Sequence, residues 1–354
     1  MTHTLLAVLI GSTLTGGIAH AEATYAVTDL GTLGGFASEA YGINDSGQVV
    51  GWAHAAGGAQ HAFLYSAGVM TDIGSLGGGS SLAHDVSDSG QVVGESWTSS
   101  GAIHPFVYTS GGGLIDLGAI GGNRSYGYGI NDSNQVVGGT SLGSPTLGAH
   151  SFIYSTHMTD LGVLPGGSYS TAYGINTQGW VVGSSDSALD YNQHAVLYTA
   201  LGIQDLGTQG QSSVAYDIND AGLIVGRSGN TGALFTAFGT IDLGTFGGYH
   251  SQANGISNLS QIVGWATNAG DQRRAFVYSS GSMTNLNSLI DPLSGWQIED
   301  ARDINDAGQI AAFGCNASTC HALLLTPVPE PQTWAMLLAG LVFVGLRLRK
   351  ERRV

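Results

Sequence analysis

The chain of 354 residues is short of positive charge. It contains one lysine, Lys350, and between residues 22 and 328 its only basic side chains besides histidine are five arginines. The same span holds 23 acidic side chains, which gives it a net charge of −18. A surface of this sign repels phosphate backbones, so the sequence excludes a nucleic acid as a partner.

Proline and cysteine are also scarce, with 7 and 2 residues, whereas glycine is abundant at 57. Glycine and proline together stay below the roughly 25–30% that marks unstructured low-complexity chains. Hydrophobic residues make up 43% of the chain, enough to build a core. The composition therefore predicts a folded protein.

Residues 1–21 have the pattern of a secretory signal peptide. An apolar run from Leu5 to Ile10 leads to Ala19 and Ala21, the small residues of a cleavage site. The segment before the run has no Lys or Arg, so a buried terminal strand or helix stays open as the alternative. In an exported body Cys315 and Cys320 are expected to form a local disulfide. Two cysteines offer too few ligands for a metal site.

The opposite end has three parts in order. Pro329, Glu330 and Pro331 form the first, and residues 333–346, which carry no charge, form the second. This stretch is shorter than the roughly 20 residues of a full span, but we expect it to be a C-terminal transmembrane helix because a basic cluster stops transfer and stays cytoplasmic. The acidic body then faces outward from the inner membrane. The basic stop consists of Arg347, Arg349, Lys350, Arg352 and Arg353.

Residues 328–354, with these three parts, resemble the PEP-CTERM sorting signal of Gram-negative bacteria. Glu351, within the basic end, is a departure from that pattern. The resemblance implies recognition by an exosortase and cleavage near the Pro-Glu-Pro motif. It further implies membrane anchoring until processing, and then delivery to the cell surface or an exopolysaccharide matrix.

Residues 22–327 consist of seven repeats. The segment Ile43-Asn44-Asp45-Ser46-Gly47-Gln48-Val49-Val50-Gly51 recurs in steps of 43, 44, 45, 43, 38 and 48 residues. His61-Ala62-Phe63 and a later Asp-Leu-Gly are two further landmarks that recur. The copies of Ile43 are Val86, Ile130, Ile175, Ile218, Ile256 and Ile304.

Each repeat predicts four short strands, called a to d below, which in the first copy cover residues 39–43, 48–53, 62–66 and 69–73. The turn between strands a and b suits a bulge with positive φ at Gly47. Asn134 stands at that place in the third copy, and Asn tolerates the same conformation.

Four strands in about 43 residues are typical of a β-propeller blade. The chain begins with an isolated strand d at residues 25–30, whereas its last repeat lacks one. The sequence thus predicts an all-β, seven-bladed β-propeller whose ring is closed by the N-terminal strand. An open β-solenoid is the rival architecture, but it gives no reason for complementary ends.

The repeats resemble the HAF family of extracellular repeat proteins, named for the triplet seen at His61-Ala62-Phe63. The resemblance covers about residues 25–325. It implies export and repetition, and no chemistry that can be assigned to a residue.

Residues that recur in every repeat are expected to build the blade. We therefore predict that the histidine of strand c bonds to the aspartate that follows it by 10–12 residues in copies such as His61 and Asp72. Asn44, Asp45 and Ser46 could supply oxygens to calcium, but an Asx-type turn explains the same residues. No cofactor or metal is predicted, and calcium is kept as the alternative.

Binding residues are expected where the repeats differ, in the b–c loops and the d–a connections. Exposed aromatic rings there could stack on sugars, and the alternative is that they pack between blades. The candidate ligand face consists of Phe36, Trp97, Arg124, Tyr169, Tyr191, Tyr249 and Trp296.

Two acidic groups are the candidates for catalysis, although neither has a recognisable partner arrangement, and no catalytic residue is assigned. We therefore favour an exported, non-catalytic binding or scaffold protein for polysaccharide or surface partners. The alternative is a secreted hydrolase or lyase that acts on exopolysaccharide. The two groups are Asp186 with Asp190, and Glu299, Asp300 and Asp303 beside Arg302.

Overall fold

The computed structural model describes residues 24–143, 148–188, 190, 192–207 and 210–328. These residues form 28 β-strands and two short 3-10 helices, so this part of the chain is all-β as predicted. None of its helices is long and apolar enough to cross a membrane. The predicted signal peptide, residues 1–21, and the predicted transmembrane segment, residues 333–346, lie outside the described residues and stay predictions.

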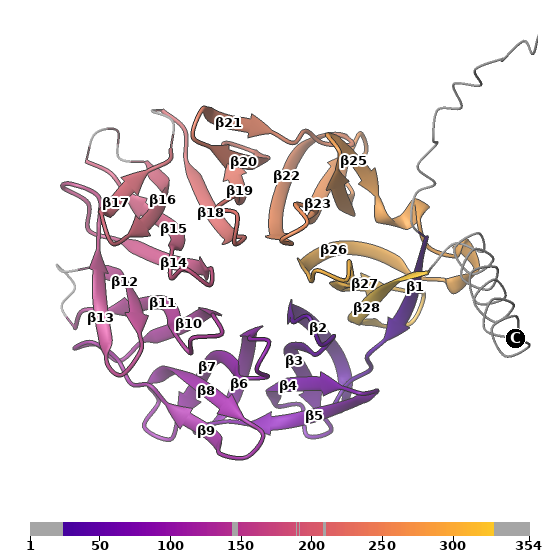
Figure 1. The fold of residues 1–354 in the computed structure, drawn as a ribbon. Helices are drawn as coiled ribbons and strands as arrows, with labels where there is room; N and C mark the ends of the chain where they lie inside the picture. Colours follow the sequence, from indigo (N-terminus) through magenta and orange to yellow (C-terminus); the bar gives the residue numbers. More distant parts are fainter. Residues whose placement is uncertain (1–23, 144–147, 189, 191, 208–209, 329–354) are drawn as a thin grey trace, which may run out of the picture. The chain divides into compact units, whose positions relative to one another are not determined.

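The strands form five four-stranded sheets and one eight-stranded sheet, in which a single bridge joins two four-stranded units. We call the seven four-stranded units blades 1 to 7 in chain order, and they are arranged around a central channel (Figure 1). From the channel outward, blade 1 holds β2 (Gly34–Ile43), β3 (Val49–Ala55), β4 (Gln60–Ser66) and β5 (Val69–Gly74); blade 2 holds β6 (Gly77–Val86), β7 (Val92–Thr98), β8 (Ile103–Thr109) and β9 (Gly113–Asp116). Blade 3 holds β10 (Ser125–Ile130), β11 (Val136–Ser141), β12 (Ala149–Tyr154) and β13 (Met158–Gly162); blade 4 holds β14 (Ser170–Ile175), β15 (Val181–Asp186), β16 (Gln193–Thr199) and β17 (Gly202–Asp205). Blade 5 holds β18 (Ser213–Ile218), β19 (Ile224–Ser228), β20 (Thr231–Thr236) and β21 (Gly239–Asp242); blade 6 holds β22 (Gly247–Ile256), β23 (Ile262–Asn268), β24 (Arg273–Ser279) and β25 (Ser282–Asn285). Blade 7 holds β26 (Gln297–Ile304), β27 (Ile310–Cys315) and β28 (Cys320–Val328), with β1 (Thr24–Asp29) outermost.

Blades 1 to 6 are antiparallel meanders, and the four strands of every blade correspond to the predicted strands a to d. The predicted positive φ at the a–b turn is present at Gly47 (73°) and at Asn134 (61°). Strand β2 starts five residues before the predicted boundary because Gly34 pairs with Ala55, past a bulge, at the end of strand b. A pattern of alternating side chains does not reveal an extension that begins with Gly34 and Gly35, which have no side chains to alternate.

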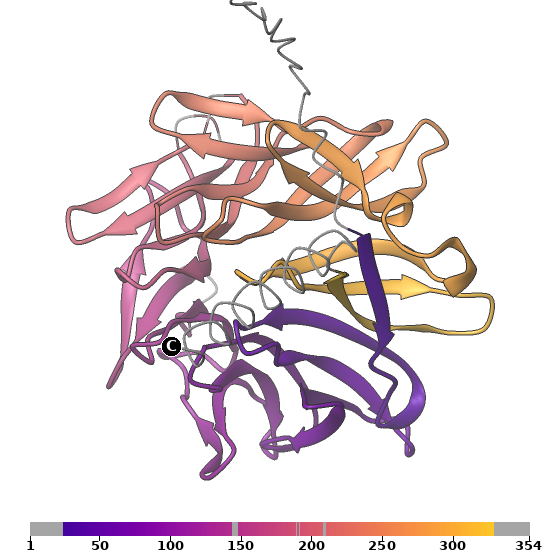
Figure 2. The ribbon, with the colours of Figure 1, turned by 45° about the vertical axis from the view of Figure 1, so that its right-hand side comes forward.

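The two ends of the propeller meet in blade 7. Strand β1 pairs with β28 (Figure 2), and the Leu30 amide donates to the Ala322 carbonyl at 3.0 Å. His321 of β28 bonds to Asp29 of β1 at 2.9 Å. One parallel bridge, from Ala37 to Cys320, then joins blade 1 to blade 7. The N-terminal strand therefore completes the last sheet, as the order of the landmarks predicts.

An insertion between blades 6 and 7 holds β1 in place. It contains the 3-10 helices η1 (Leu286–Ser288) and η2 (Pro292–Ser294). Its residues Leu289 and Ile290 pack in one buried cluster with Tyr25 of β1, and the Tyr25 amide donates to the Leu289 carbonyl at 2.8 Å. This insertion accounts for the longest step between repeats, 48 residues.

The core lies between adjacent blades, because each sheet buries both faces against its neighbours. Phe106 of blade 2 packs with Val50 and Leu64 of blade 1, for example. The phenylalanines of the His-Ala-Phe landmark fill this position fully buried. They are Phe63, Phe106, Phe152 and Phe276.

The glycine that follows Val-Val in strand b has a steric cause. A Cβ atom at Gly51 would overlap the Glu39 carbonyl oxygen of β2, at the bulge where the pairing register shifts between Ala40 and Gly42. The crowding of the inner two strands thus explains why glycine recurs there.

Loss of the Tyr25 side chain should loosen the closure. Tyr25 is 6% exposed, so we expect Tyr25→Ala to lower the free energy of unfolding by about 3 kcal/mol. Tyr249→Ala removes the same ring from a site that is 80% exposed, and should change stability by less than about 0.5 kcal/mol. Denaturant titration measures both, and equal losses would contradict a special role for the N-terminal strand.

Candidate functional site

The blades present two different faces. The d–a connections bridge to the b–c loops, as in the pairs Leu33 with Ala55 and Phe246 with Asn268, so these variable segments share one face, which we call the loop face. The a–b turns connect the strands at the opposite face of the disc. There they surround the other mouth of the channel.

Four of the predicted aromatic and basic side chains are strongly exposed on the loop face. Phe36 is 71% exposed, Tyr169 55% and Tyr249 80%, and Arg124 is also exposed. Phe36 stacks on His54 with ring centroids 4.0 Å apart. Their role in binding stays a prediction, but their positions leave them free to contact a ligand.

The remaining aromatic candidates differ. Trp97 is 41% exposed, and its backbone lies so close to Gly78 that a Cβ atom on Gly78 would not fit. Trp296 is partly buried against the cluster that holds Tyr25, with its ring centroid 6.1 Å from that of His321. Trp296 therefore packs within the fold, which is the alternative that the sequence left open for these rings. Tyr191 lies outside the described residues.

The strand-c histidines make the predicted bonds to aspartate within their blades. The Nδ1 atoms of His61, His104 and His150 lie 2.8–2.9 Å from an aspartate oxygen. In blade 1 that aspartate, Asp72, also accepts from the Gly74 amide at 2.8 Å. These groups pair strands c and d, which confirms the prediction that the repeated histidines build the blades.

His194 of blade 4 departs from this pattern. It is 1% exposed and has aspartates on both sides, Asp205 at 2.8 Å and Asp190 at 3.2 Å. Burial opposes the charged imidazole, but the two hydrogen bonds outweigh it and raise the pKa of His194. Asp190, an acid considered for catalysis, thus has a structural partner.

The other acidic candidates are also held by the fold. Asp186 accepts the backbone amides of Ser168 and Tyr169 at 2.8 and 2.7 Å. Asp300 is 1% exposed, and Arg273 and Arg302 each lie 3.4 Å from it. Burial raises the pKa of Asp300 in spite of both arginines. The two acidic groups are not brought together.

The a–b turns are linked around the channel mouth. The Asn44 side-chain amide donates to the Ser87 carbonyl of the next blade at 2.9 Å, and Asn305 donates to the Asn44 carbonyl at the closure. Asp45 accepts the Asp306 amide in the same way at 2.8 Å. The turns enclose a cavity of about 180 Å³. No three His, Cys, Asp or Glu side chains of the described residues are grouped to hold a metal ion.

Three further aspartates line the channel wall. Asp85 accepts the Ile130 amide of the next blade at 2.9 Å and the Val86 amide at 2.7 Å, and Asp217 and Asp303 do the same in their blades. Loss of hydration raises the pKa of Asp85 and of Asp217 to about 6. The pKa of Asp303 is raised as well, by burial and by the charges of the other two.

A band of flat side chains surrounds the channel, formed by the residue two positions before the end of each strand a. Neighbouring ring centroids lie 5.0–5.4 Å apart from Tyr41 through Tyr216, and the Arg302 guanidinium lies 5.2 Å from the Tyr41 ring. The band consists of Tyr41, His84, Tyr128, Tyr173, Tyr216, Asn254 and Arg302.

One strand-b position lies against this band, and its residue is Trp in blades 1 and 6 and a different one in each of the other blades. Trp52 of blade 1 donates its indole N–H to the Tyr41 hydroxyl at 3.2 Å, and Glu95 of blade 2 bonds to His84 at 3.0 Å. Gly139 of blade 3 has no side chain to place there. The residues at this position are Trp52, Glu95, Gly139, Ser184, Arg227, Trp265 and Phe313.

A cavity of about 260 Å³ occupies the space beside Gly139, between blades 3 and 4. We call it the blade 3–4 pocket. Tyr126 and Tyr128 of β10, Thr171 of β14 and the rim residue Arg124 line it. Sequence reasoning identified Arg124 but missed the pocket. The sequence does contain a sign of the pocket, because this repeat alone has a second glycine, Gly139, directly after Val-Val-Gly.

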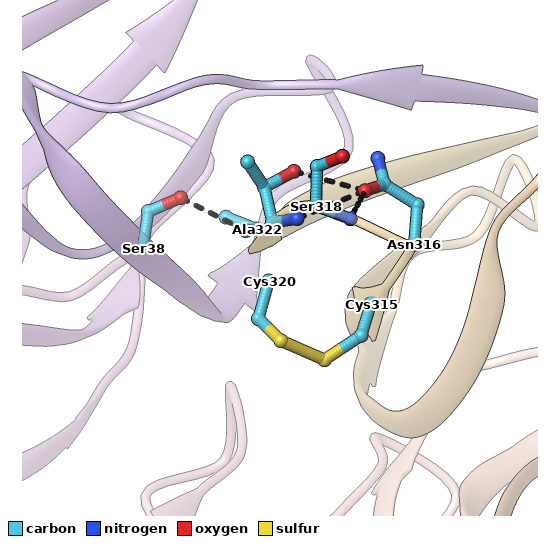
Figure 3. Close-up of a disulfide and its surroundings, with 7 residues drawn as sticks. Ser38, Cys315, Asn316, Ser318, Cys320 and Ala322 are labelled. Carbon is cyan, nitrogen blue, oxygen red and sulfur yellow. Dashed lines mark hydrogen bonds between the residues drawn. A yellow bond between two sulfur atoms is a disulfide. The ribbon is translucent and has the colours of Figure 1, made fainter.

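A disulfide closes the β27–β28 hairpin of blade 7. Cys315 and Cys320 are bonded, with Cα atoms 4.1 Å apart (Figure 3). In the loop they enclose, Asn316 accepts the amides of Ser318 and Thr319. Next to the bridge, the Ala322 amide donates to Ser38 of blade 1 at 2.9 Å. The disulfide thus lies where the ring closes.

The channel aspartates should make stability depend on pH. The folded chain keeps protons on Asp85 and Asp217 up to about pH 6, whereas the ordinary value is 3.8, so stability falls as the pH rises through that window. We expect the free energy of unfolding to be lower at about pH 7.5 than at about pH 5.

Asp217→Gly, which installs the residue found at this place in blade 1, should reduce that difference between the two pH values. Asp271→Asn, on an exposed b–c turn, is the control and should keep it. An Asp217→Gly protein with the full wild-type difference would show that the channel carboxylates do not titrate as described.

The comparison with protein families matches residues 327–353 to the PEP-CTERM protein-sorting motif. The chain therefore carries this sorting motif, as the Pro-Glu-Pro pattern predicts, and the motif implies exosortase processing. The match covers the tail alone, so the HAF resemblance of the repeats stays a prediction. The comparison with curated proteins finds no match.

Among solved structures, the chain is similar to Aleuria aurantia lectin mutants. One, in complex with Fucα1-6GlcNAc, has 12% identity and a TM-score of 0.42, with 74% of this chain and 94% of that chain covered. AofleA from Arthrobotrys oligospora has 11% identity and a TM-score of 0.35, with 86% and 90% covered.

Proposed function

We propose that this protein is exported, sorted by an exosortase to the cell surface or extracellular matrix, and acts there without catalysis by binding polysaccharide through the loop face. The sorting motif at residues 327–353 supports export and processing. On this proposal residues 1–21 are the signal peptide and residues 333–346 anchor the chain in the inner membrane until it is cleaved.

The observation that carries the binding proposal is the exposure of aromatic rings on one face. Phe36 and Tyr249 follow the Gly-Gly pair of their d–a connections directly, and Tyr169 follows its pair by two residues. All three are more than half exposed. Single exposed apolar residues are ordinary, but rings repeated at the same edge of a disc favour a contact surface. Flat rings beside Ser and Asn side chains suit the faces and hydroxyl groups of sugars.

Replacing these rings should weaken glycan binding. We expect the purified chain to bind a subset of an array of bacterial polysaccharides, and Tyr249→Ala combined with Trp97→Ala to reduce that binding at least tenfold. Leu201→Ala is the matched control, since Leu201 is fully exposed at the c–d turn of blade 4, away from the loop face. Equal losses in both proteins would contradict binding at the loop face.

The array samples should also be analysed for cleavage. Shortening of an exopolysaccharide by the purified chain, lost on Asp186→Ala or Asp303→Ala, would replace the binding function by the hydrolase or lyase alternative.

The tail should determine where the protein resides. We expect deletion of residues 329–354 to change the mature mass and to release the protein from the fraction that holds the wild type. Cell fractionation and intact-mass measurement, with and without the host exosortase, test this. An unchanged mass and location would show that the motif is not used for processing.

A further inference from the structure

The blade 3–4 pocket exists because one repeat lacks a side chain that fills the same space elsewhere. Trp52 and Trp265 occupy the equivalent position in blades 1 and 6. A Cβ atom at Gly139 would come no closer than 3.5 Å to Thr171, an ordinary contact, so neither crowding nor a positive φ requires glycine here. The backbone of blade 3 could hold a larger residue, and the sequence leaves the space open.

The walls of the pocket combine flat rings with polar groups. The rings of Tyr126 and Tyr128 lie nearly parallel, at 9° with centroids 6.2 Å apart, and form no side-chain hydrogen bond within the described residues. Thr171 and Ser141 add hydroxyl groups. The volume of about 260 Å³ is below the roughly 300–1,000 Å³ of pockets that enclose drug-sized ligands. The size and chemistry suit one sugar ring.

The charge of the pocket is opposite to that of the disc. No acidic residue lines it, in a body with a net charge of −18. Within the described residues Arg124 is the one arginine whose guanidinium forms no hydrogen bond or ion pair, whereas Arg273 and Arg302 are paired with Asp300. Glu95 is near enough for its charge to contribute to the raised pKa of Tyr128, but its carboxylate is bonded to His84. An unpaired guanidinium favours a carboxylate, which it can hold through two hydrogen bonds.

We propose that the blade 3–4 pocket binds a single hexuronic acid unit of a polysaccharide, with its ring against Tyr126 and Tyr128 and its carboxylate on Arg124. The inference rests on the proposed saccharide-binding function and names the ligand class of that face. A long polyanion lying across the disc would be repelled, so the unit is taken from a chain end or a branch. Salt at physiological ionic strength screens charges that lie more than about 8 Å apart. The negative charge of the rest of the disc therefore repels a single unit only weakly.

The test compares methyl β-D-glucuronide with methyl β-D-glucoside by titration calorimetry on the purified full chain. The two probes share a ring and differ in the carboxylate. We expect the glucuronide to bind at least tenfold more tightly, and Arg124→Gln to remove that preference. Sodium acetate, a carboxylate without a ring, should not bind measurably.

Gly139 supplies a graded pair of variants. Gly139→Trp introduces the residue of blades 1 and 6 and should abolish binding of both probes, whereas Gly139→Ser, the residue of blade 4, should retain it. Arg124 is exposed, so Arg124→Gln keeps the test decisive even where Gly139→Trp folds poorly. Equal affinity for both probes, or glucuronide binding that withstands Gly139→Trp, would overturn the proposal.

The array separates this inference from the function on which it rests. If no polysaccharide binds the wild type, the proposed function fails. If binding is lost in the Tyr249→Ala, Trp97→Ala protein but is unchanged in Gly139→Trp, the function stands and the assignment of the pocket is wrong.

Discussion

The pairing of β1 with β28 is the constraint on which the propeller depends. Every blade buries both faces against its neighbours, so a gap between any two would expose an apolar sheet face and free strand edges. The covalent chain joins each blade to the next except at the gap between its two ends. There the last sheet takes its outer strand from the start of the chain, and His321 and Asp29 repeat, between segments 292 residues apart, the contact that other blades make within one hairpin.

The same junction is reinforced from several directions. The insertion that carries η1 and η2 covers Tyr25, and the disulfide fixes the hairpin beside β1. At the channel mouth Asn305 and Asp306 reach Asn44 and Asp45 just as each turn reaches the next. These contacts all lie at blade 7, the one blade among the described residues whose strands come from both ends of the segment 24–328.

Crowding near the channel explains why some positions of the blade carry the same small residue in most repeats, whereas neighbouring positions with more room vary. Small residues and bulges let the inner strands approach, and Gly51 shows the cost of a side chain there. The band from Tyr41 to Arg302 and the strand-b position beside it keep the same backbone while their side chains vary among the blades, although Tyr recurs in the band and Trp at the strand-b position. The backbone of the blades therefore stays the same while these side chains vary, and the glycine of blade 3 is one such variation.

The sequence by itself determined the blade, its turns and the closure. Asn134 at a left-handed turn and the aspartates spaced from the histidines of strand c are local patterns, and the complementary chain ends predict a ring by topology alone. It also identified the sorting tail. Only the tertiary structure decided which aromatic rings are free, since Trp296 packs and Tyr249 does not, and which carboxylates are partners of arginine or histidine. The blade 3–4 pocket likewise required the structure. A missing side chain becomes a cavity only when residues of the β10–β11 hairpin and of β14, in the next blade, enclose the space that it leaves.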